Sequence, residues 1–543
     1  MKTNLTLLFI LLTNHLAFAE WSTNSTNNNL ICGDFYHQNG IQMISDGSGG
    51  AIITWLDYRS PGNYSIFAQR INKYGTNQWT TNGVQISPFG ISGEYPSITS
   101  DGNGGAIITW SGGGNFASVI AQRVSAGGVI QWGTNGTLVS TMNVPYESGK
   151  ITSDGSGGAI IAWTDGRTLD SFDYNIYAQR INSNGIVQWV SNGVAIVVAP
   201  KYQGSLQIAG DGNGEAVIAW QDTRDDRGTN VDVFVQKVSA TGSMQWNPNG
   251  VALSSTLGGG DRYLQLFSEA GAAIVCWQDT RNGIDLNIYA QKINSNGAVQ
   301  WAANGVAASL STNNQEFSQL TTDANGGAII CWVDLPLGLG IRDIYAQRIN
   351  SSGTVLWASN GAPVCTQSNN QALPQIARDG YGGATIVWVD GRGPTNPNDI
   401  YSQRIDANGI ALWTTNGVAV STATGNQTLP FIINDGINGM IVSFQDGRKD
   451  PNRSDIYAQR LNPDGTLGRV IPLALSAAVR PTASRFQFTI SGTIGRTNII
   501  EVSSTLTNWT PIATNVVLSE FYNYTNLNAT NLLRQFYRIR QTP

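Results

Sequence analysis

One unit of about 55 residues is repeated eight times along the chain, and this repeat constrains the fold more than any other feature. The clearest copy runs from Asp379 through Trp388 and Arg392 to Trp413. A period of this length is typical of solenoids, propellers and repeat arrays. Every copy carries an acidic residue in a turn, and these turn acids are Asp46, Asp101, Asp154, Asp211, Glu269, Asp323, Asp379 and Asp435.

Each unit is expected to contain four short strands and almost no helix. In the seventh copy we predict strands over Pro374 to Arg378, Ala384 to Asp390 and Asp399 to Ile405, with a fourth around Trp413. The second strand is a continuous apolar run, which suits burial on both faces, and the third alternates with a period of two. Asp-Gly-x-Gly-Gly and Asn-Gly supply the positive φ angles of tight hairpins. Four antiparallel strands form a propeller blade, so we predict an all-β, eight-bladed β-propeller.

The two ends of the repeat complement each other. The last unit ends near Arg469 without its own tryptophan, whereas Trp21 begins a Trp-Ser-Thr-Asn segment that matches the Trp-Thr-Thr-Asn at Trp79. The N-terminal segment therefore carries the piece that the last unit lacks. This predicts a closed ring of eight blades, with a seven-bladed ring or an open solenoid as alternatives.

The charge balance excludes several classes of partner. The chain has 31 basic and 36 acidic residues, a net charge of −5 and only 12% charged residues. Such a balance gives no field of one sign that would attract nucleic acid or anionic lipid. Fifteen of the 16 tryptophans and most of the 62 glycines occupy recurring positions of the repeat, and Trp509 lies in the C-terminal segment, so their abundance is no evidence of a ligand site.

The N-terminal segment has the features of a signal peptide. It contains Lys2, an apolar run over Leu5 to Leu12, and the small-x-small segment Ala17 to Ala19 before Glu20. No later segment approaches the roughly 18 apolar residues that a membrane-spanning helix needs. We therefore predict a secreted or cell-surface protein without a transmembrane segment, and we expect a monomer.

The C-terminal segment lacks the repeat. It is predicted to form short strands joined by polar turns, such as Phe486 to Ser491 and Phe536 to Arg540. We expect three parts: a signal peptide (1–19), an eight-bladed β-propeller (20–471) and a small C-terminal β-sandwich-like module (472–543).

Two resemblances follow from these motifs. The units with Asp-Gly-x-Gly-Gly, Trp-x-Asp-x-Arg and Ile-Tyr-Ala-Gln-Arg, over residues 21 to about 470, resemble the repeats of exported bacterial β-propeller proteins of mostly unassigned activity. The tail, with Ser504 to Pro511 and Arg534 to Arg538, is similar to a short C-terminal β module of many exported bacterial proteins, which implies retention at the surface. Neither resemblance carries a catalytic motif.

The turn acids are expected to be structural. The spacing from Asp46 to Trp55 is longer than in the sialidase Asp-box, and an Asp in such a turn commonly caps backbone amides. We predict no cofactor and no metal site. Calcium at these turns remains an alternative, although each loop offers one carboxylate where calcium needs several oxygens.

The Trp-x-Asp-x-Arg motif is also expected to be structural, because a single active site needs only one copy. We expect Asp–Arg or Arg–backbone bonding, with the Arg of Gln69-Arg70 and its equivalents as partner. Unit two, with Ser111 and three glycines, and unit six, with Asp334 but Pro336, depart from the motif. The complete copies are Asp57/Arg59, Asp165/Arg167, Asp222/Arg224, Asp279/Arg281, Asp390/Arg392 and Asp446/Arg448.

Ligand binding is expected on the face that carries the longer, variable loops, because loops on a rigid scaffold carry binding. The loops entering the first strands bear an aromatic residue in six consecutive units, which would stack on sugar or peptide or else pack between blades. Charged loop residues form the second candidate set, with a solvated surface cluster as the alternative. The candidate ligand-binding residues are Tyr36, Tyr95, Tyr146, Tyr202, Tyr263, Phe317, Arg224, Asp226, Arg227 and Arg262.

Few catalytic mechanisms remain, and no catalytic residue is identified. His37 is the only histidine after the predicted signal peptide, and no Gly-x-Ser-x-Gly or His-Glu-x-x-His motif occurs. Cys276 and Cys331 occupy one strand position in successive units and are interpreted as buried small residues. Carboxylate chemistry remains, with three glutamates in variable loops: Glu94, Glu147 and Glu316.

The sequence thus favours an exported, non-catalytic binding or scaffold protein that uses its variable-loop face, with a carbohydrate or protein ligand. The first alternative is a polysaccharide-acting hydrolase or lyase that uses loop carboxylates. The second alternative is a structural protein of the cell envelope.

Overall fold

The computed structural model describes residues 20–541, apart from 61–62, 89–93, 113–117, 142–144, 168–172, 225–230, 256–259, 261, 282, 337–339, 394–397, 469–473, 483–484, 493–496, 506–507, 517–520 and 527–535. The predicted signal peptide, residues 1–19, lies outside this part of the chain. The described residues contain strands and no helix, so none of their segments is a helix that could cross a membrane.

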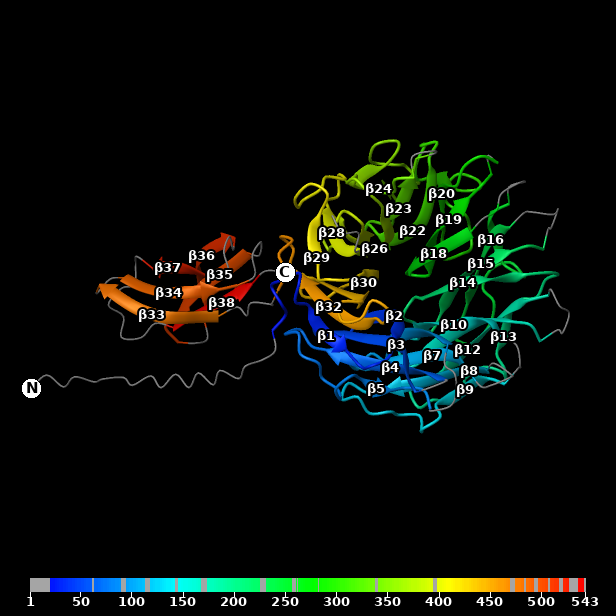
Figure 1. Cartoon of the computed structure of the whole chain (residues 1–543), viewed down its shortest axis with the longest axis horizontal. Helices are drawn as coiled ribbons and strands as arrows, with labels where there is room; N and C mark the ends of the chain where they lie inside the picture. The colour runs from blue at the N-terminus through cyan, green and yellow to red at the C-terminus, as the bar shows by residue number, and fades with distance from the viewer. Residues whose placement is uncertain are drawn as a thin grey trace, which may run out of the picture.

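Eight four-stranded antiparallel sheets are arranged in a ring (Figure 1). We number these sheets as blades 1 to 8 in chain order. The first strands of the blades are β2 (Gln38–Ser45), β6 (Glu94–Ser100), β10 (Pro145–Ser153), β14 (Gln203–Gly210), β18 (Arg262–Glu269), β22 (Asn314–Thr322), β26 (Gln371–Arg378) and β30 (Gln427–Asn434). The second strands are β3 (Ala51–Ser60), β7 (Ala106–Gly112), β11 (Ala159–Asp165), β15 (Ala216–Asp222), β19 (Ala272–Asp279), β23 (Ala328–Leu335), β27 (Ala384–Asp390) and β31 (Met440–Asp446).

The third strands are β4 (Asn63–Ile71), β8 (Ser118–Val124), β12 (Asn175–Ile181), β16 (Asp232–Val238), β20 (Asn287–Ile293), β24 (Asp343–Ile349), β28 (Asp399–Ile405) and β32 (Asp455–Leu461). The fourth strands are β5 (Val84–Gln85), β9 (Thr137–Ser140), β13 (Val194–Val197), β17 (Val251–Ser254), β21 (Val306–Ala307), β25 (Ala362–Cys365), β29 (Val418–Ser421) and, in blade 8, β1 (Asn29–Cys32). The eight-bladed propeller predicted from the repeat is therefore confirmed.

The ring closes by strand exchange between the two ends of the propeller segment. Strand β1 pairs antiparallel with β32, so the N-terminal segment completes blade 8. Ile31 and Cys32 on β1 are buried in the same core cluster as Ile441 and Ile456 of blade 8. The closed ring expected from the complementary ends is confirmed.

A repeated hydrogen bond joins each blade to the next. The indole N–H of a tryptophan donates to a backbone carbonyl in the turn after the next blade's third strand, at 3.0 or 3.1 Å in all eight cases. Trp413 of blade 7 donates to Pro463 of blade 8, and Trp21 donates to Lys73 of blade 1. The closing seam therefore has the geometry of the other seams.

The fourth strand was placed wrongly from the sequence. Trp413 does not lie in it, because Trp413 precedes β29 by a turn that contains Asn416 and Gly417. Gly417 is required in this turn because the ring of the blade's second-strand tryptophan, Trp388, lies under it, where a Cβ would approach the ring to 2.6 Å. The two tryptophans thus pack in different places: Trp388 lies in the core cluster between blades 6 and 7, and Trp413 packs against the cluster between blades 7 and 8.

The C-terminal segment forms two three-stranded sheets. One contains β33 (Ala474–Thr482), β34 (Arg485–Ser491) and β37 (Phe521–Asn526), and the other β36 (Thr510–Val516), β35 (Thr497–Ser503) and β38 (Phe536–Gln541). Phe488, Ile490 and Ile500 from both sheets form a core cluster of their own. The domain boundaries given above stay a prediction.

Candidate functional site

The turn acids have two partners in most blades. Asp46 accepts hydrogen bonds from the backbone N–H groups of Ser48 and Gly50 at 2.8 Å through Oδ1, while its Oδ2 accepts Arg70 Nε at 3.0 Å. The predicted capping of turn amides is confirmed. Six blades hold this Asp–Arg ion pair: Asp46/Arg70, Asp101/Arg123, Asp154/Arg180, Asp323/Arg348, Asp379/Arg404 and Asp435/Arg460.

The same observation corrects the partner expected for the Trp-x-Asp-x-Arg motif. Asp57 pairs with its own motif arginine, Arg59, whose Nε donates to Asp57 Oδ1 at 2.8 Å. Arg70 lies at the other end of the strands and binds Asp46 instead. The motif is structural as predicted, but the partner of Asp57 is Arg59, two residues further along the same strand, β3.

Blades 4 and 5 lack the Asp–Arg pair. At the position of Arg70 they carry Lys237 and Lys292. Lys237 forms an ion pair with Glu215 at 2.6 Å, and Lys292 donates to the carbonyl of Gly326, also at 2.6 Å. Among the described residues, the turn acids of these blades, Asp211 and Glu269, therefore have no cationic partner.

Glu269 is also displaced by a shorter turn. The hairpin of blade 5 pairs Glu269 with Ala272 and turns through Ala270 and Gly271, with φ angles of 51° and 74°. This two-residue turn removes the extra amides that an Asp-Gly-x-Gly-Gly loop would place around the carboxylate. Glu269 consequently ends strand β18 as an exposed residue.

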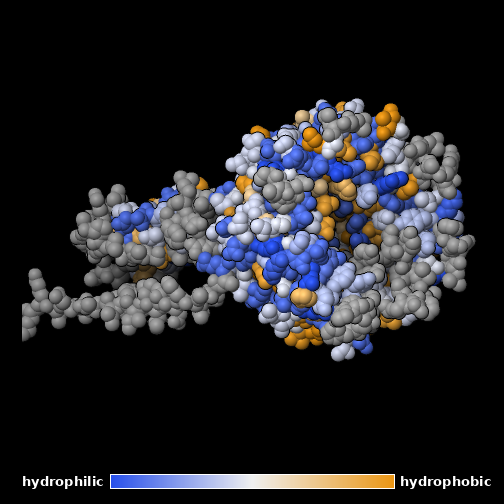
Figure 2. All heavy atoms as spheres, viewed as in Figure 1, coloured by the Kyte–Doolittle hydropathy of each residue, from blue (hydrophilic) through white to orange (hydrophobic). Residues whose placement is uncertain are grey.

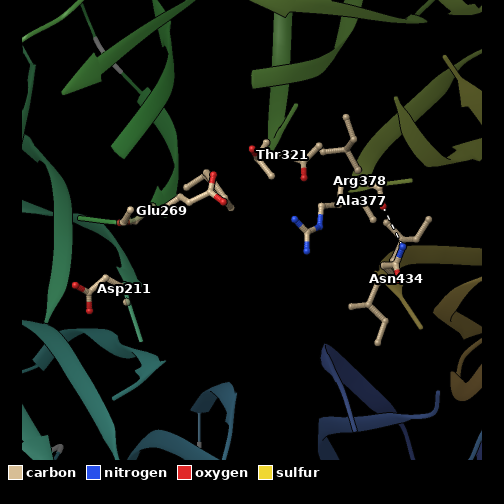
Figure 3. Close-up of a pocket in the computed structure, with 14 residues that line it drawn as sticks. Asp211, Glu269, Thr321, Ala377, Arg378 and Asn434 are labelled. Atoms are coloured by element: carbon tan, nitrogen blue, oxygen red, sulfur yellow. Dashed lines mark hydrogen bonds between the residues drawn. The ribbon is translucent and has the colours of Figure 1, made fainter. Parts of the chain in front are cut away.

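A cavity of about 560 Å³ lies at the turn ends of the first strands of blades 4 to 8. The space-filling view is hollowed at the centre of the ring, with hydrophobic residues around the hollow (Figure 2). Asp211 and Glu269 lie on one side of the cavity, and Arg378 and Asn434 lie on the other (Figure 3). The lining residues are Gly210, Asp211, Phe267, Ser268, Glu269, Ala270, Thr321, Thr322, Ile376, Ala377, Arg378, Ile432, Ile433 and Asn434.

Arg378 is the second departure from the repeat at this cavity. The residue directly before the turn acid is serine in four blades, as at Ser45, and is small or uncharged in three others. Arg378 is exposed at the end of β26, and its carbonyl accepts Asn434 Nδ2 at 3.3 Å. The cavity therefore combines two carboxylates without cationic partners, one guanidinium, hydroxyls and an apolar floor from three blades. Such a combination can bind a polar chain by hydrogen bonds and transfer protons at it.

The described aromatic candidates differ in their exposure. Tyr36 and Tyr263 are exposed, with 59% of Tyr263 accessible, while Tyr202 and Phe317 are partly buried. The rings of Tyr263 and Phe317 lie 6.0 Å apart at bulges with φ angles of 50° and 55°. Tyr95 and Tyr146 lie in strands, but their side chains lie outside the described part. Among the four aromatics whose side chains are described, none lines the cavity, and ligand binding by the six stays a prediction.

The charged candidates separate as well. Arg224 is the structural arginine of blade 4, since its Nε donates to Asp222 Oδ1 at 2.9 Å. Arg262 is exposed on β18. Asp226 and Arg227 lie outside the described residues. Among the described residues of this set, Arg262 is thus the one candidate whose side chain makes no structural hydrogen bond or ion pair.

The four cysteines and His37 do not line the cavity in the described part of the chain. Cys276 and Cys331 are buried thiols, as expected, and burial raises the pKa of Cys276 to about 12. No group of three or more His, Cys, Asp or Glu side chains that could hold a metal occurs in the described part of the chain. Burial lowers the pKa of His37, which bonds to Ser454 away from the cavity.

The signal for Asp211 and Glu269 was present in the sequence. Both were identified as turn acids, but their release from the ion pair depends on a distant change, Arg to Lys at Lys237 and Lys292. Comparing the turn acid with the third-strand cation, unit by unit, would have found them.

No protein-family model matches the chain, and no curated protein matches it. Among solved structures, an ulvan lyase of polysaccharide lyase family PL25, bound to -[GlcA(1-4)Rha3S]-, is similar with 12% identity and a TM-score of 0.44, over 69% of this chain and 93% of that one. The polysaccharide lyase Uly1 is similar with 10% identity and a TM-score of 0.41, over 72% of this chain and 93% of that one. An α-L-arabinofuranosidase from Fusarium graminearum has 11% identity and a TM-score of 0.31, over 53% of this chain and 88% of that one.

These neighbours are enzymes that act on carbohydrates, and the expectation of a non-catalytic binding or scaffold protein is wrong in their light. At such identities and TM-scores the neighbours carry no argument about residues, so the proposal below depends on the cavity alone.

Proposed function

We propose that the protein is a polysaccharide-degrading enzyme, a hydrolase or a lyase, and that it works at the cavity between the first strands of blades 4 to 8. The observation that supports this most is the release of two turn carboxylates, Asp211 and Glu269, from the arginine that holds their equivalents in six other blades. Six copies of the pair demonstrate its structural use, and the two exceptions are adjacent and share one cavity. Loss of a structural rule at one place is typical of functional sites.

The chemistry of the cavity fits cleavage of a glycosidic bond. In a hydrolase, one carboxyl group protonates the leaving oxygen while a second carboxylate activates water or attacks the sugar. Glu269 is exposed on the cavity side at the end of its strand and is the proposed proton-transfer group, with Asp211 on the neighbouring blade as the second acid.

Arg378 extends the proposal to the charge of the substrate. A guanidinium group binds carboxylate or sulfate through paired hydrogen bonds. Its place opposite Glu269 favours an acidic polysaccharide, in which the bound carboxylate would also make the neighbouring C–H more acidic for a lyase reaction.

A panel of neutral and acidic polysaccharides tests the proposal. Formation of new reducing ends reports both reactions, and ultraviolet absorbance of an unsaturated sugar reports the lyase reaction only. Glu269→Gln is expected to lower the rate by at least about a hundredfold. Glu215→Gln is the matched control, because Glu215 pairs with Lys237 and does not line the cavity. Equal activity of the Glu269 variant and the wild type would refute the assignment.

The proposal includes export, as the composition of residues 1–19 indicates. Mass spectrometry of the protein recovered from the medium or the cell surface should find an N-terminus at Glu20. An N-terminus at Met1 in the recovered protein would contradict this part.

A further inference from the structure

The Trp-x-Asp-x-Arg motif builds the same cation site in six blades. In blade 1, Arg59 donates its backbone N–H and Nε to Asp57 Oδ1 at 2.9 and 2.8 Å, and its guanidinium carbon lies 3.7 Å from the centre of the Phe67 ring. The corresponding ring distances in the other five blades run from 3.4 to 4.1 Å. In each site, one guanidinium group thus binds a buried carboxylate and lies against the face of an aromatic ring.

A third contact completes this site in five blades. The arginine Nη2 donates to the carbonyl of an asparagine in the turn before the fourth strand, at 2.8 or 2.9 Å. Each of these asparagines has a positive φ of 60° to 63°, which a non-glycine residue adopts only where its surroundings compensate. The five residues are Asn82, Asn192, Asn249, Asn304 and Asn416.

Blades 2 and 6 lose the motif in different ways. Blade 2 has Gly112 at the aspartate position and no arginine, so it has lost both charges. Blade 6 keeps Asp334 and replaces only the arginine, by Pro336. Proline has neither a guanidinium nor a backbone N–H, so both donors to Oδ1 of this aspartate disappear together.

The carboxylate that remains in blade 6 is buried. Asp334 is 5% exposed, and among the described residues it accepts one hydrogen bond, from Asn313 Nδ2 at 2.5 Å. The indole N–H of the fully buried Trp332, whose counterparts in five blades donate to the motif aspartate, makes no hydrogen bond of ordinary geometry in the described part, although it lies close enough to Asp334 to lower the pKa of that carboxyl. A buried carboxylate without a cation is costly, which is why such groups are normally paired.

The surroundings of Asp334 add negative charge and leave an aromatic face. Asp343 is its direct partner in the ladder between β23 and β24, and Tyr345 is the partner of Trp332. Burial, together with the charge of Asp334, raises the pKa of Asp343 to about 6, and burial also raises the pKa of Asp334. Among the described residues no cation lies over the Tyr345 ring, whereas the equivalent ring holds an arginine in six blades.

We propose that Asp334, Asp343 and the Tyr345 ring form a socket on blade 6 that binds the guanidinium group of an arginine supplied by another molecule. We call these three side chains the blade-6 socket. A guanidinium is favoured over an ammonium because it binds a carboxylate through two parallel N–H groups and stacks flat on an aromatic ring. Four filled copies in the same chain have both parallel N–H bonds, and all six place the guanidinium over the aromatic ring.

Binding is expected to change the neighbouring turn. Asn360 of blade 6 corresponds to the five asparagines whose carbonyls accept the arginine, but its φ is not positive. The bound guanidinium would gain this third acceptor only when Asn360 adopts the φ of its counterparts. The amide resonance of Asn360 is therefore a direct reporter of occupation.

The test titrates the full chain with Nα-acetyl-arginine amide, free arginine and an arginine-containing peptide, and follows binding by calorimetry and by the Asn360 resonance. Arginine is expected to bind at least about tenfold more tightly than the lysine analogue, and the citrulline analogue is not expected to bind. Peptide binding that exceeds free arginine would identify a polypeptide partner. Equal binding of both would identify the free amino acid.

Three variants make the result decisive. Asp334→Asn removes the carboxylate, and Pro336→Arg supplies the missing arginine from within, so both should abolish binding of arginine, while Pro336→Arg should also raise the thermal midpoint. Arg392→Ala opens the equivalent site of blade 7 and should add a second arginine site of similar affinity. The proposal is overturned if wild type does not bind arginine, or if Asp334→Asn and Pro336→Arg bind it as wild type does.

Discussion

Removal of the Trp21 side chain tests whether the closing seam stabilises the ring as the other seams do. Trp21 is 1% exposed in the core cluster that joins blade 8 to blade 1, and its Nε1 donates to the carbonyl of Lys73 at 3.0 Å. Truncation of a buried tryptophan to alanine costs about 3–5 kcal/mol. The lost hydrogen bond contributes about 1 kcal/mol of this cost. We therefore expect Trp21→Ala to lower the free energy of unfolding by about 4 kcal/mol.

Trp413→Ala is the internal comparison. Trp413 makes the same hydrogen bond, to Pro463 at 3.0 Å, but it joins blades 7 and 8, which are continuous in the chain. If strand exchange closes the ring, the two substitutions should cost similar amounts, although one removes a residue near the chain end and the other a residue in the middle.

Guanidinium chloride unfolding followed by far-ultraviolet circular dichroism measures both free energies, since this signal does not depend on the tryptophan that is removed. The slope of the transition should stay constant if only the folded state is affected. A cost below about 1 kcal/mol for Trp21→Ala, beside several kcal/mol for Trp413→Ala, would refute a closed ring of equal seams.

Three further perturbations address the turns, the ion pairs and the acids of blade 6. Gly83→Ala should destabilise by about 1–3 kcal/mol more than Gly102→Ala in chemical unfolding, because both glycines have positive φ but only a Cβ at the first meets a ring carbon, at 2.6 Å; equal costs would refute this clash. Arg404→Met should cost about 3 kcal/mol in the same assay, because it leaves a buried turn carboxylate unpaired, and a neutral result would mean that the pair is not stabilising. The pKa of Asp343 is raised to about 6 in the folded protein, so folding favours its protonated form, and the free energy of unfolding should fall as the pH rises from about 4 through 6. Asp343→Asn should reduce this fall, and an unchanged pH profile would exclude the Asp334–Asp343 repulsion as its cause.

The blade architecture could be predicted from the sequence because its causes are local and repeated. The strand Ala384–Asp390 is an unbroken apolar run, and the strand Asp399–Ile405 alternates, so both were placed with the bounds that the structure has. The fourth strand could not be placed in this way. Its position depends on how Trp413 reaches the next blade and on how Gly417 fits the ring of Trp388, which are contacts between distant segments.

The cavity was harder to predict because its residues look structural in a single unit. Glu269 differs from the other turn acids by one methylene, and its turn is one residue shorter. Lys292 carries an ammonium group where six other blades carry the guanidinium group of an arginine. Each change is small by itself. The fold connects the two changes, because the third-strand cation and the first-strand acid lie at the same end of the blade, where they form an ion pair in other blades.

The loss of an arginine has opposite consequences at the two ends of a blade, and this explains why two different sites are proposed. At the turn end, replacement by Lys292 frees a carboxylate at the edge of a cavity, where water and substrate can solvate it, so Glu269 remains exposed and available for proton transfer. At the motif end, replacement by Pro336 leaves Asp334 buried, where no solvent offsets the charge and a cation stabilises it. The first loss therefore favours chemistry on a substrate, and the second favours binding of a group that restores what the repeat has lost.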